Sequence, residues 1–271
     1  MGDAAHAMHR RRFLGLLGAG AGATVAGAAG VLVGGTAWGE SETEPPHFGY
    51  EGKVRADRWG SLAPEYETCS IGTSQAPVNL VPADGQPSSS TLELRYAPVA
   101  ASTLNNGHTL QVVTEEGASV AIDGEAFPLV QFHYHTPSEH TLDGRPYLVE
   151  WHFVHQTADA KTAVLGVMVQ LGAEHAGYAS ILAAMPKREG KTKALAAPVD
   201  PSALLPSDRA ALGYGGSLTT PPCTEAVHWT VLETPIEMSE EQIRTLQNYL
   251  GPNARPLQAL NGRTIERRSV A

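Results

Sequence analysis

The chain has 271 residues, of which 42% are hydrophobic and 17% charged, and this globular composition excludes a wholly disordered or fibrous protein. Its 28 acidic and 19 basic residues give a formal net charge of −9, which argues against a nucleic acid partner because phosphate binding needs clustered positive charge. Two cysteines are too few for a disulfide scaffold or for a cysteine-based zinc site.

The N-terminal stretch has the features of an export signal. Arg-Arg-Arg-Phe-Leu stands at residues 10–14, a run rich in glycine and alanine continues to Val33, and small residues surround Ala37. This pattern predicts a signal peptide over residues 1–37, and its Arg-Arg-x-Phe-Leu order resembles the twin-arginine leader, which exports folded proteins. The alternative is a retained transmembrane anchor over residues 14–33, although 12 of these 20 residues are glycine or alanine.

Residues 38–46 are polar, contain proline and are predicted to be a linker. A single domain is expected over residues 47–271, because no second composition shift and no internal repeat follow. Export predicts a periplasmic or extracellular location, where conditions are oxidising. After removal of the leader we expect no stable insertion into a membrane.

The body of the chain consists mainly of short apolar runs separated by turn residues, which is the pattern of β-strands. Most gaps between the runs are too short for the helices of a βαβ series, so the sheet is predicted to be largely antiparallel. The candidate strands are residues 91–96, 109–114, 119–122, 129–135, 147–155, 163–171 and 227–232.

Two segments are predicted to be helices. Ser-Glu-Glu-Gln at 239–242 is a capping box, and apolar residues follow it at helical spacing until Gly251. A second helix is expected at 179–185, because Pro186 ends a short apolar run.

Three histidines stand on two consecutive candidate strands. Because strand side chains alternate between faces, His133 and His135 share a face with Gln131, and His152 shares a face with Glu150. If the two strands pair in antiparallel fashion, the three imidazoles converge and leave zinc one open position, which is a catalytic arrangement. Gln131 and Glu150 are suited to accept the remaining N–H groups of the ligands.

The other histidines do not extend this pattern. An isolated His-x-His pair is more often a surface feature or a satisfied core feature, and only the third histidine and its polar neighbours favour metal binding. His155 points to the opposite face and is interpreted as structural, and His140 is left out of the ligand set. His47 and His175 have no constellation around them in the sequence.

A second enzyme class fits part of the same segment. His133-x-His135 followed by Glu139 matches the first metal motif of cupins, in which the glutamate is a ligand. The glycine spacing fits that motif poorly, and His152 lies closer than expected for the second cupin motif.

Motifs along the whole body then narrow the choice. Asn-Asn-Gly-His stands at 105–108, Gln-Phe-His-Tyr-His at 131–135, Ser-Glu-His-Thr at 138–141, Glu-Trp-His-Phe-Val-His at 150–155 and Ser-Leu-Thr-Thr-Pro-Pro-Cys at 217–223. Further signatures lie at 48–50, 75–79, 253–256 and 261–263. In their type and order these motifs resemble an α-class carbonic anhydrase of the exported bacterial kind, from about residue 47 to about residue 268. This ordered agreement displaces the cupin interpretation.

The resemblance implies a mainly β fold around a central, strongly twisted, mostly antiparallel sheet of ten strands, with a few short peripheral helices. It implies one zinc ion per chain, held by His133, His135 and His152. It also implies that Glu139 accepts the hydroxyl proton of Thr219, and that Thr219 orients the zinc-bound hydroxide that attacks carbon dioxide.

The same resemblance assigns a substrate pocket and a proton shuttle. His108 would be the shuttle at the mouth of the cavity, because an imidazole has an ordinary pKa close to neutral. The backbone N–H of Thr219 and the side chain of Thr220 would line the pocket. Its apolar wall would consist of Val154, Val164, Leu218, Val227 and Trp229; without the resemblance these are ordinary core residues.

The sequence departs from the family's pattern at a few places. Phe48 stands where the family often has tryptophan, Gln111 replaces a commonly seen asparagine, and the connection after His135 is short, as in bacterial members. None of these departures touches the three ligands or the pair formed by Glu139 and Thr219.

The function implied is the reversible, zinc-dependent hydration of carbon dioxide to bicarbonate and a proton, by a monomer or homodimer with a small-molecule substrate. The alternative is a non-catalytic exported relative that binds zinc or another ligand. Silent relatives of this family typically lack one of the three histidines, whereas this chain retains all three.

The two cysteines are predicted to form a disulfide. Cys69 and Cys223 are the only cysteines in the chain, and exposed thiols would oxidise in an exported protein. Cys223 directly follows Thr-Thr-Pro-Pro, so the bond would attach the substrate loop to the N-terminal segment.

Overall fold

The computed structural model describes residues 46–271. The predicted signal peptide lies outside the described residues, as does the predicted linker apart from its last residue. The strands are β1 (Asn79–Leu80), β2 (Gln86–Pro87), β3 (Leu92–Arg95), β4 (Ala101–Asn105), β5 (Leu110–Thr114), β6 (Ser119–Ile122), β7 (Glu125–His135), β8 (Thr141–Leu142), β9 (Val149–Gln156), β10 (Thr162–Leu171), β11 (Thr192–Ala194), β12 (Ala210–Ser217), β13 (Glu225–Met238) and β14 (Glu266–Ser269). The α-helices are α2 (Thr68–Ile71), α3 (Ala176–Ala183) and α4 (Glu240–Leu250).

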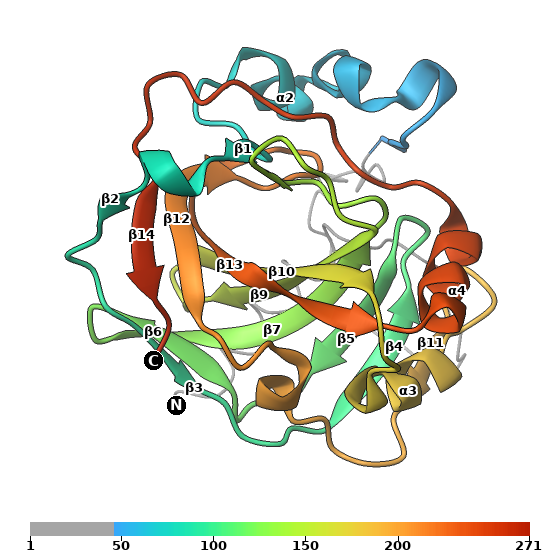
Figure 1. Cartoon of the computed structure of the whole chain (residues 1–271). Helices are drawn as coiled ribbons and strands as arrows, with labels where there is room; N and C mark the ends of the chain where they lie inside the picture. Colours follow the sequence, from blue (N-terminus) through green and yellow to red (C-terminus); the bar gives the residue numbers. More distant parts are fainter. Residues whose placement is uncertain (1–45) are drawn as a thin grey trace, which may run out of the picture.

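One large sheet runs through the centre of the molecule (Figure 1). It has twelve strands, and its main path follows the order β11-β4-β5-β7-β9-β10-β13-β12-β14-β2. β6 pairs with β7 beside this path, and β3 pairs with β6. Within the described residues, only β10 with β13 and β14 with β2 are parallel neighbours in this sheet. The expected mainly β fold with a mostly antiparallel sheet is confirmed; its main path contains the ten strands, and β3 and β6 add two.

The helices lie at the periphery, and one of them differs from the sequence-based expectation. α4 has the predicted capping box, since Ser239 accepts the backbone N–H of Gln242 and Gln242 accepts that of Ser239. α3 occupies Ala176–Ala183 rather than 179–185. The α conformation is disfavoured at Met185, the residue before Pro186. The helix therefore ends earlier than its apolar pattern indicates.

The two faces of the central strands differ in the side chains that they carry. On one face, the aromatic side chains of Phe132, Tyr134 and Trp151 are fully buried beneath the helices. The indole of Trp151 lies 4.7 Å from the ring of Tyr178 in α3, measured between centroids, and the Tyr134 hydroxyl donates to the carbonyl of Leu246 in α4 at 2.8 Å. The residues that alternate with these aromatics along the strands point to the other face.

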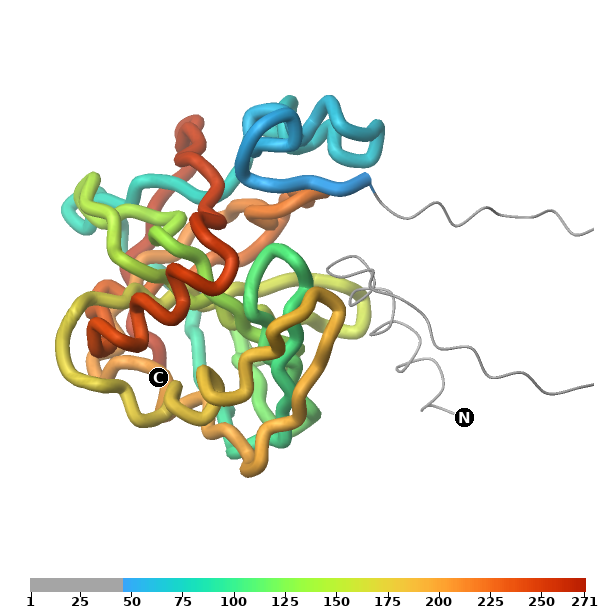
Figure 2. Tube along the Cα trace, turned by 90° about the vertical axis from the view of Figure 1, so that its right-hand side faces the viewer, coloured from blue at the N-terminus to red at the C-terminus, as the bar shows by residue number. Residues whose placement is uncertain are grey.

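The first described segment, residues 46–71, is called the N-terminal segment. It crosses one end of the molecule, beside the chain that follows α4 (Figure 2). Cys69 in α2 forms the predicted disulfide with Cys223, with an S–S distance of 2.08 Å, and Arg255 donates from Nη2 to the Cys69 carbonyl at 3.0 Å. Three segments far apart in the sequence are thereby joined. Between residues 46 and 271, no helix is long and apolar enough to span a membrane.

Candidate metal centre

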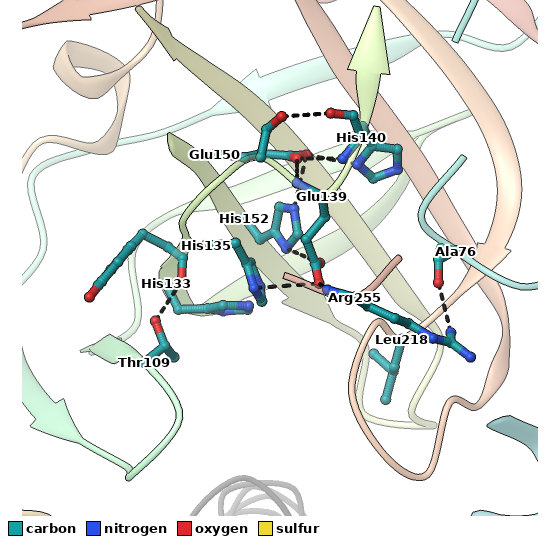
Figure 3. Close-up of polar contacts among 12 residues, drawn as sticks. Ala76, Thr109, His133, His135, Glu139, His140, Glu150, His152, Leu218 and Arg255 are labelled. Atoms are coloured by element: carbon teal, nitrogen blue, oxygen red, sulfur yellow. Dashed lines mark hydrogen bonds and ion pairs between the residues drawn. The ribbon is translucent and has the colours of Figure 1, made fainter. Parts of the chain in front are cut away.

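Three imidazoles converge on the face of the sheet opposite the aromatic core (Figure 3). β7 and β9 pair in antiparallel fashion, with His133 opposite His152 and His135 opposite Glu150. Directly paired residues share a face, so this register brings the two strands' histidines together as the alternation pattern predicts. One nitrogen from each of the three rings lies within 4.8 Å of the other two.

The predicted polar partners hold two of the rings. The Nδ1 atom of His133 lies 2.9 Å from Oε1 of Gln131, at hydrogen-bonding distance. The Nε2 atom of His152 lies 2.9 Å from Oε1 of Glu150. In both rings the second nitrogen is therefore left to face the neighbouring imidazoles.

The third ring is held by a group that the sequence did not identify. The Nδ1 atom of His135 lies 2.7 Å from the backbone carbonyl oxygen of Asn253, in the segment after α4. A backbone carbonyl has no side-chain signature, so only the Asn-x-Arg-Pro motif at 253–256 drew attention to this segment. The Nε2 atom of His135 is buried and has no hydrogen-bond partner in the protein, as expected of a nitrogen that binds a metal ion.

All three rings are neutral at physiological pH. Burial lowers the pKa of His135 to about 4 and places that of His133 well below its ordinary value, with the adjacent rings adding to the effect. Burial also lowers the pKa of His152, although the carboxylate of Glu150 opposes this. Neutral imidazole is the form that binds zinc, so the donor set fits a divalent metal ion.

Glu150 is the centre of a buried network that includes His140. Its Oε1 lies 2.8 Å from His140 Nδ1, and its Oε2 accepts the backbone N–H groups of Glu139 and His140, each at 2.9 Å. The His140 Nε2 atom lies 2.7 Å from the hydroxyl of Tyr214. Burial favours protonation of Glu150, but His140 and His152 outweigh it and hold its pKa well below the ordinary value. His140 thus fixes the carboxylate that holds His152, a function that the sequence did not indicate.

Glu139 lies beside the imidazoles and is 2% exposed. Its Oε1 accepts the backbone N–H of Arg255 at 2.7 Å and lies 3.5 Å from His135 Nδ1. Burial raises the pKa of Glu139 to about 7, against the opposing effects of His152, of a hydrogen bond with the Thr219 side chain and of the Arg255 N–H. That Glu139 accepts the hydroxyl proton of Thr219 stays a prediction.

An open cleft leads to the three imidazoles, with an empty volume of about 620 Å³ that includes solvent at its mouth. One wall is apolar and the other carries amides and imidazole. The lining includes these residues that the sequence placed at the pocket or its rim: Val154, Val164, Leu218, Thr219, Thr220, Trp229, His108 and Gln111. It also includes Gln131, predicted as the partner of His133, and four residues that were not predicted to line it: Phe48, Tyr50, Asn106 and Thr109. Val227 lies behind the wall, in the apolar cluster that contains Trp229, and is not among the lining residues.

His108 lies at the rim of this cleft in a stack of rings. It packs on Phe48 with ring centroids 3.9 Å apart and planes 10° apart. The ring of His47 stacks on the ring of His108, with centroids 5.8 Å apart. The sequence did not indicate this neighbour of His47. Burial, followed by the charge of His47, lowers the pKa of His108 to about 4.

The fold and the cleft together define a protein with three converging histidines on one face of a large, mostly antiparallel sheet. A sequence model described as eukaryotic-type carbonic anhydrase matches residues 55–269. A carbonic anhydrase of Pectobacterium carotovorum is 38% identical over 229 residues, which are 83% of this chain and 92% of that protein. A carbonic anhydrase of a Nostoc species is 37% identical over 268 residues, 95% of this chain and 97% of that protein.

Solved structures agree with these relatives. The alpha-carbonic anhydrase of Thermovibrio ammonificans, solved with the inhibitor sulfanilamide, superposes with a TM-score of 0.80 at 40% identity, covering 82% of this chain and 99% of that chain. The carbonic anhydrase of Photobacterium profundum gives a TM-score of 0.76 at 38% identity, covering 83% and 100%. The chain belongs to the eukaryotic-type, or alpha, carbonic anhydrase family.

Proposed function

We propose that the protein catalyses the zinc-dependent, reversible hydration of carbon dioxide to bicarbonate and a proton. The observation that carries this proposal is the convergence of three neutral imidazoles, His133, His135 and His152, at the base of an open cleft. Membership of the carbonic anhydrase family supports the same reaction.

In the proposed site the three histidines are the zinc ligands, one ion per chain. A zinc ion held by these three histidines would supply Lewis-acid chemistry, by which water becomes a nucleophile at neutral pH. In this proposal Gln131, Glu150 and the Asn253 carbonyl fix the ring orientations, because each lies within 2.9 Å of one ring nitrogen.

We assign different roles to the apolar and the polar residues that line the cleft. Carbon dioxide is apolar and uncharged, and the side chains of Val154, Val164, Leu218 and Trp229 offer it a dry surface beside the imidazoles. We assign Val227 a supporting position behind this wall rather than a contact with substrate. The polar wall keeps water available for the reaction and for removal of its proton.

Glu139 and Thr219 orient the nucleophile. When Glu139 accepts the single hydroxyl proton of Thr219, the Thr219 oxygen can only accept a further hydrogen bond. A nucleophile that carries hydrogen is then held with its proton toward Thr219 and its lone pair toward the apolar wall. The backbone N–H of Thr219 and the side chain of Thr220 line the side where the product's negative charge develops.

We also infer that the protein is exported through the twin-arginine leader predicted over residues 1–37 and acts in the periplasm or outside the cell. The disulfide between Cys69 and Cys223 fits an oxidising compartment. N-terminal sequencing of the protein recovered from outside the cytoplasm tests this inference. We expect a chain that starts near residue 38, and an intact leader on the mature protein would contradict it.

The catalytic proposal is tested by a stopped-flow pH-indicator assay of carbon dioxide hydration. The protein should accelerate hydration, and a zinc chelator or the substitution His133→Ala should abolish the acceleration. His228→Ala serves as the control, because His228 is exposed on β13 and does not line the cleft. Hydration at the uncatalysed rate by zinc-loaded wild type would favour a non-catalytic binding protein instead.

A further inference from the structure

The ring stack at the rim of the cleft joins the buried interior to solvent. Phe48 is 9% exposed and forms its inner end, His108 is half-buried in the middle, and His47 is exposed at the outer end. His47 and His108 are nearly parallel, with an interplanar angle of 27° and centroids 5.8 Å apart. A proton passes between two imidazoles through one hydrogen-bonded water when their nitrogens both lie within its reach.

His108 alone is poorly suited to hold a proton. A donor that works at neutral pH has a pKa close to 7, whereas burial and the neighbouring His47 lower the pKa of His108 to about 4. Because this pKa lies about three units below neutral pH, only about one His108 side chain in a thousand is protonated at equilibrium. A turnover limited by protonated His108 would therefore be slow, unless the proton leaves His108 as soon as it arrives.

We infer that His47 is the outer member of a two-histidine proton relay, which takes the proton from His108 and exchanges it with buffer. This inference rests on the proposed hydration of carbon dioxide. In each turnover the proton released by hydration binds one ring nitrogen of His108, and His108 releases a proton from its other ring nitrogen to His47. His47 passes this proton to a buffer base, so both rings return to their neutral forms and no proton is gained or lost by the protein.

The backbone that carries His108 is held by two hydrogen bonds. The Asn253 side chain donates to the His108 backbone carbonyl at 3.0 Å, and Asn106 Oδ1 accepts the His108 backbone N–H at 3.0 Å. The backbone at the rim is thereby fixed, and Phe48 sets the ring plane. His47 precedes Phe48 in the chain, so the same residue that packs His108 also places the second imidazole next to it.

Two substitutions separate proton relay from packing. His47→Phe keeps a ring on the stack but cannot bind a proton, whereas His47→Ala removes both. We expect each to lower kcat about tenfold in weak buffer, to leave kcat/KM unchanged because the chemical step is intact, and to recover in added imidazole. His228→Ala, an exposed histidine outside the cleft, should keep the wild-type kcat. Full kcat of His47→Phe in weak buffer would overturn the inference.

The relay order is tested by combining variants. If His47 acts after His108, the double variant His47→Phe/His108→Ala should lose no more kcat than His108→Ala alone. Any further loss of kcat in the double variant would mean that His47 acts independently of His108, which contradicts the series proposed here. Failure of the proposed function itself is distinguishable, because wild-type protein would then show no chelator-sensitive hydration.

A measurement independent of turnover tests the coupling of the two rings. In the zinc-loaded protein labelled at histidine, NMR titration of His108 should give a higher pKa in His47→Gln than in wild type, because removal of a neighbouring positive charge favours protonation. An unchanged titration of His108 would show that the two rings are not coupled and would contradict the relay.

Discussion

Each imidazole of the metal centre has one ring nitrogen held by the protein and one that faces the cleft. For His133 and His135 the held atom is Nδ1, and for His152 it is Nε2. For His133 and His135 the tautomer is therefore set before any metal binds, because a nitrogen that donates to an acceptor must carry the proton. The orientation of these imidazoles is thus set by groups that are not among the proposed metal ligands.

Glu150→Gln should weaken zinc binding about 10- to 100-fold. The amide is a weaker acceptor than the carboxylate that holds His152, and it also disturbs the contact with His140. Competition with a chromophoric chelator measures the zinc affinity directly. An affinity equal to that of wild type would show that the carboxylate does not support the ligand.

Glu139→Gln and Thr219→Ala should each lower kcat about 10²- to 10³-fold while zinc stays bound. In the proposed mechanism both residues orient the nucleophile and neither binds the metal. Hydration kinetics and metal content of the same purified samples check this. Loss of zinc from Glu139→Gln would instead make Glu139 a ligand and contradict the assignment.

At the scale of elements, the alternation of β7 and β9 explains both faces of the sheet. The side chains of His133 and His152 were predictable as neighbours, because alternation and antiparallel pairing leave few other arrangements. The capping box of α4 was predictable for a similar local reason. The pairing of strands far apart in the sequence, such as β10 with β13 in parallel, has no local signal and could not be predicted in this way.

Parts of the site were also beyond a sequence argument. The Asn253 carbonyl that holds His135 belongs to the backbone, so any residue type could have supplied it. The function of His140 depends on a contact with Glu150, ten residues away and inside the fold. The glycines of β12 weakened its strand pattern, so the sequence did not indicate this strand. A Cβ at Gly216 would lie 2.7 Å from the indole of Trp229, so the close packing there requires glycine.

β9 also carries a buried histidine on its other face, and this residue should make the protein sensitive to acid. His155 lies 2.7 Å from the Tyr96 hydroxyl through Nε2 and 3.3 Å from the Ala163 carbonyl through Nδ1. Burial lowers its pKa to about 3, whereas an unfolded chain has a histidine pKa of about 6.5. Below pH 6.5 the unfolded state therefore binds a proton that the folded state does not bind.

The free energy of unfolding should consequently fall by about 1.4 kcal/mol per pH unit for this residue, between about pH 6 and pH 4. In His155→Gln this contribution disappears, so the pH dependence should be shallower by about one proton, whatever the change in absolute stability. Urea unfolding at several pH values measures the slope. Equal slopes for the two proteins would refute the assignment.

At the scale of the whole molecule, the disulfide joins the N-terminal segment to the loop beside the substrate pocket. Cys69 and Cys223 are separated by 154 residues, and Arg255 adds hydrogen bonds to the carbonyls of Cys69 and Ala76. The backbone N–H of Arg255 at the same time holds Glu139. The disulfide and Arg255 thus link the segment around Cys69, the loop that carries Cys223 and the buried Glu139.

The double substitution Cys69→Ala/Cys223→Ala should lower the free energy of unfolding by up to about 5 kcal/mol, since a cross-link that closes so long a loop strongly restricts the unfolded chain. Chemical denaturation of the variant and of the oxidised wild type gives the difference. The wild type under reducing conditions should resemble the variant. A variant as stable as the oxidised protein would show that the bond contributes nothing to the fold.

The central claim is that one zinc ion, held by His133, His135 and His152, enables the chain to hydrate carbon dioxide. The most direct test is zinc titration of the metal-free full-length protein, with hydration activity and bound metal measured on each sample. Activity should be absent without metal and rise linearly until one zinc is bound per chain. Hydration by the metal-free protein, or none at one bound zinc per chain, would contradict the account.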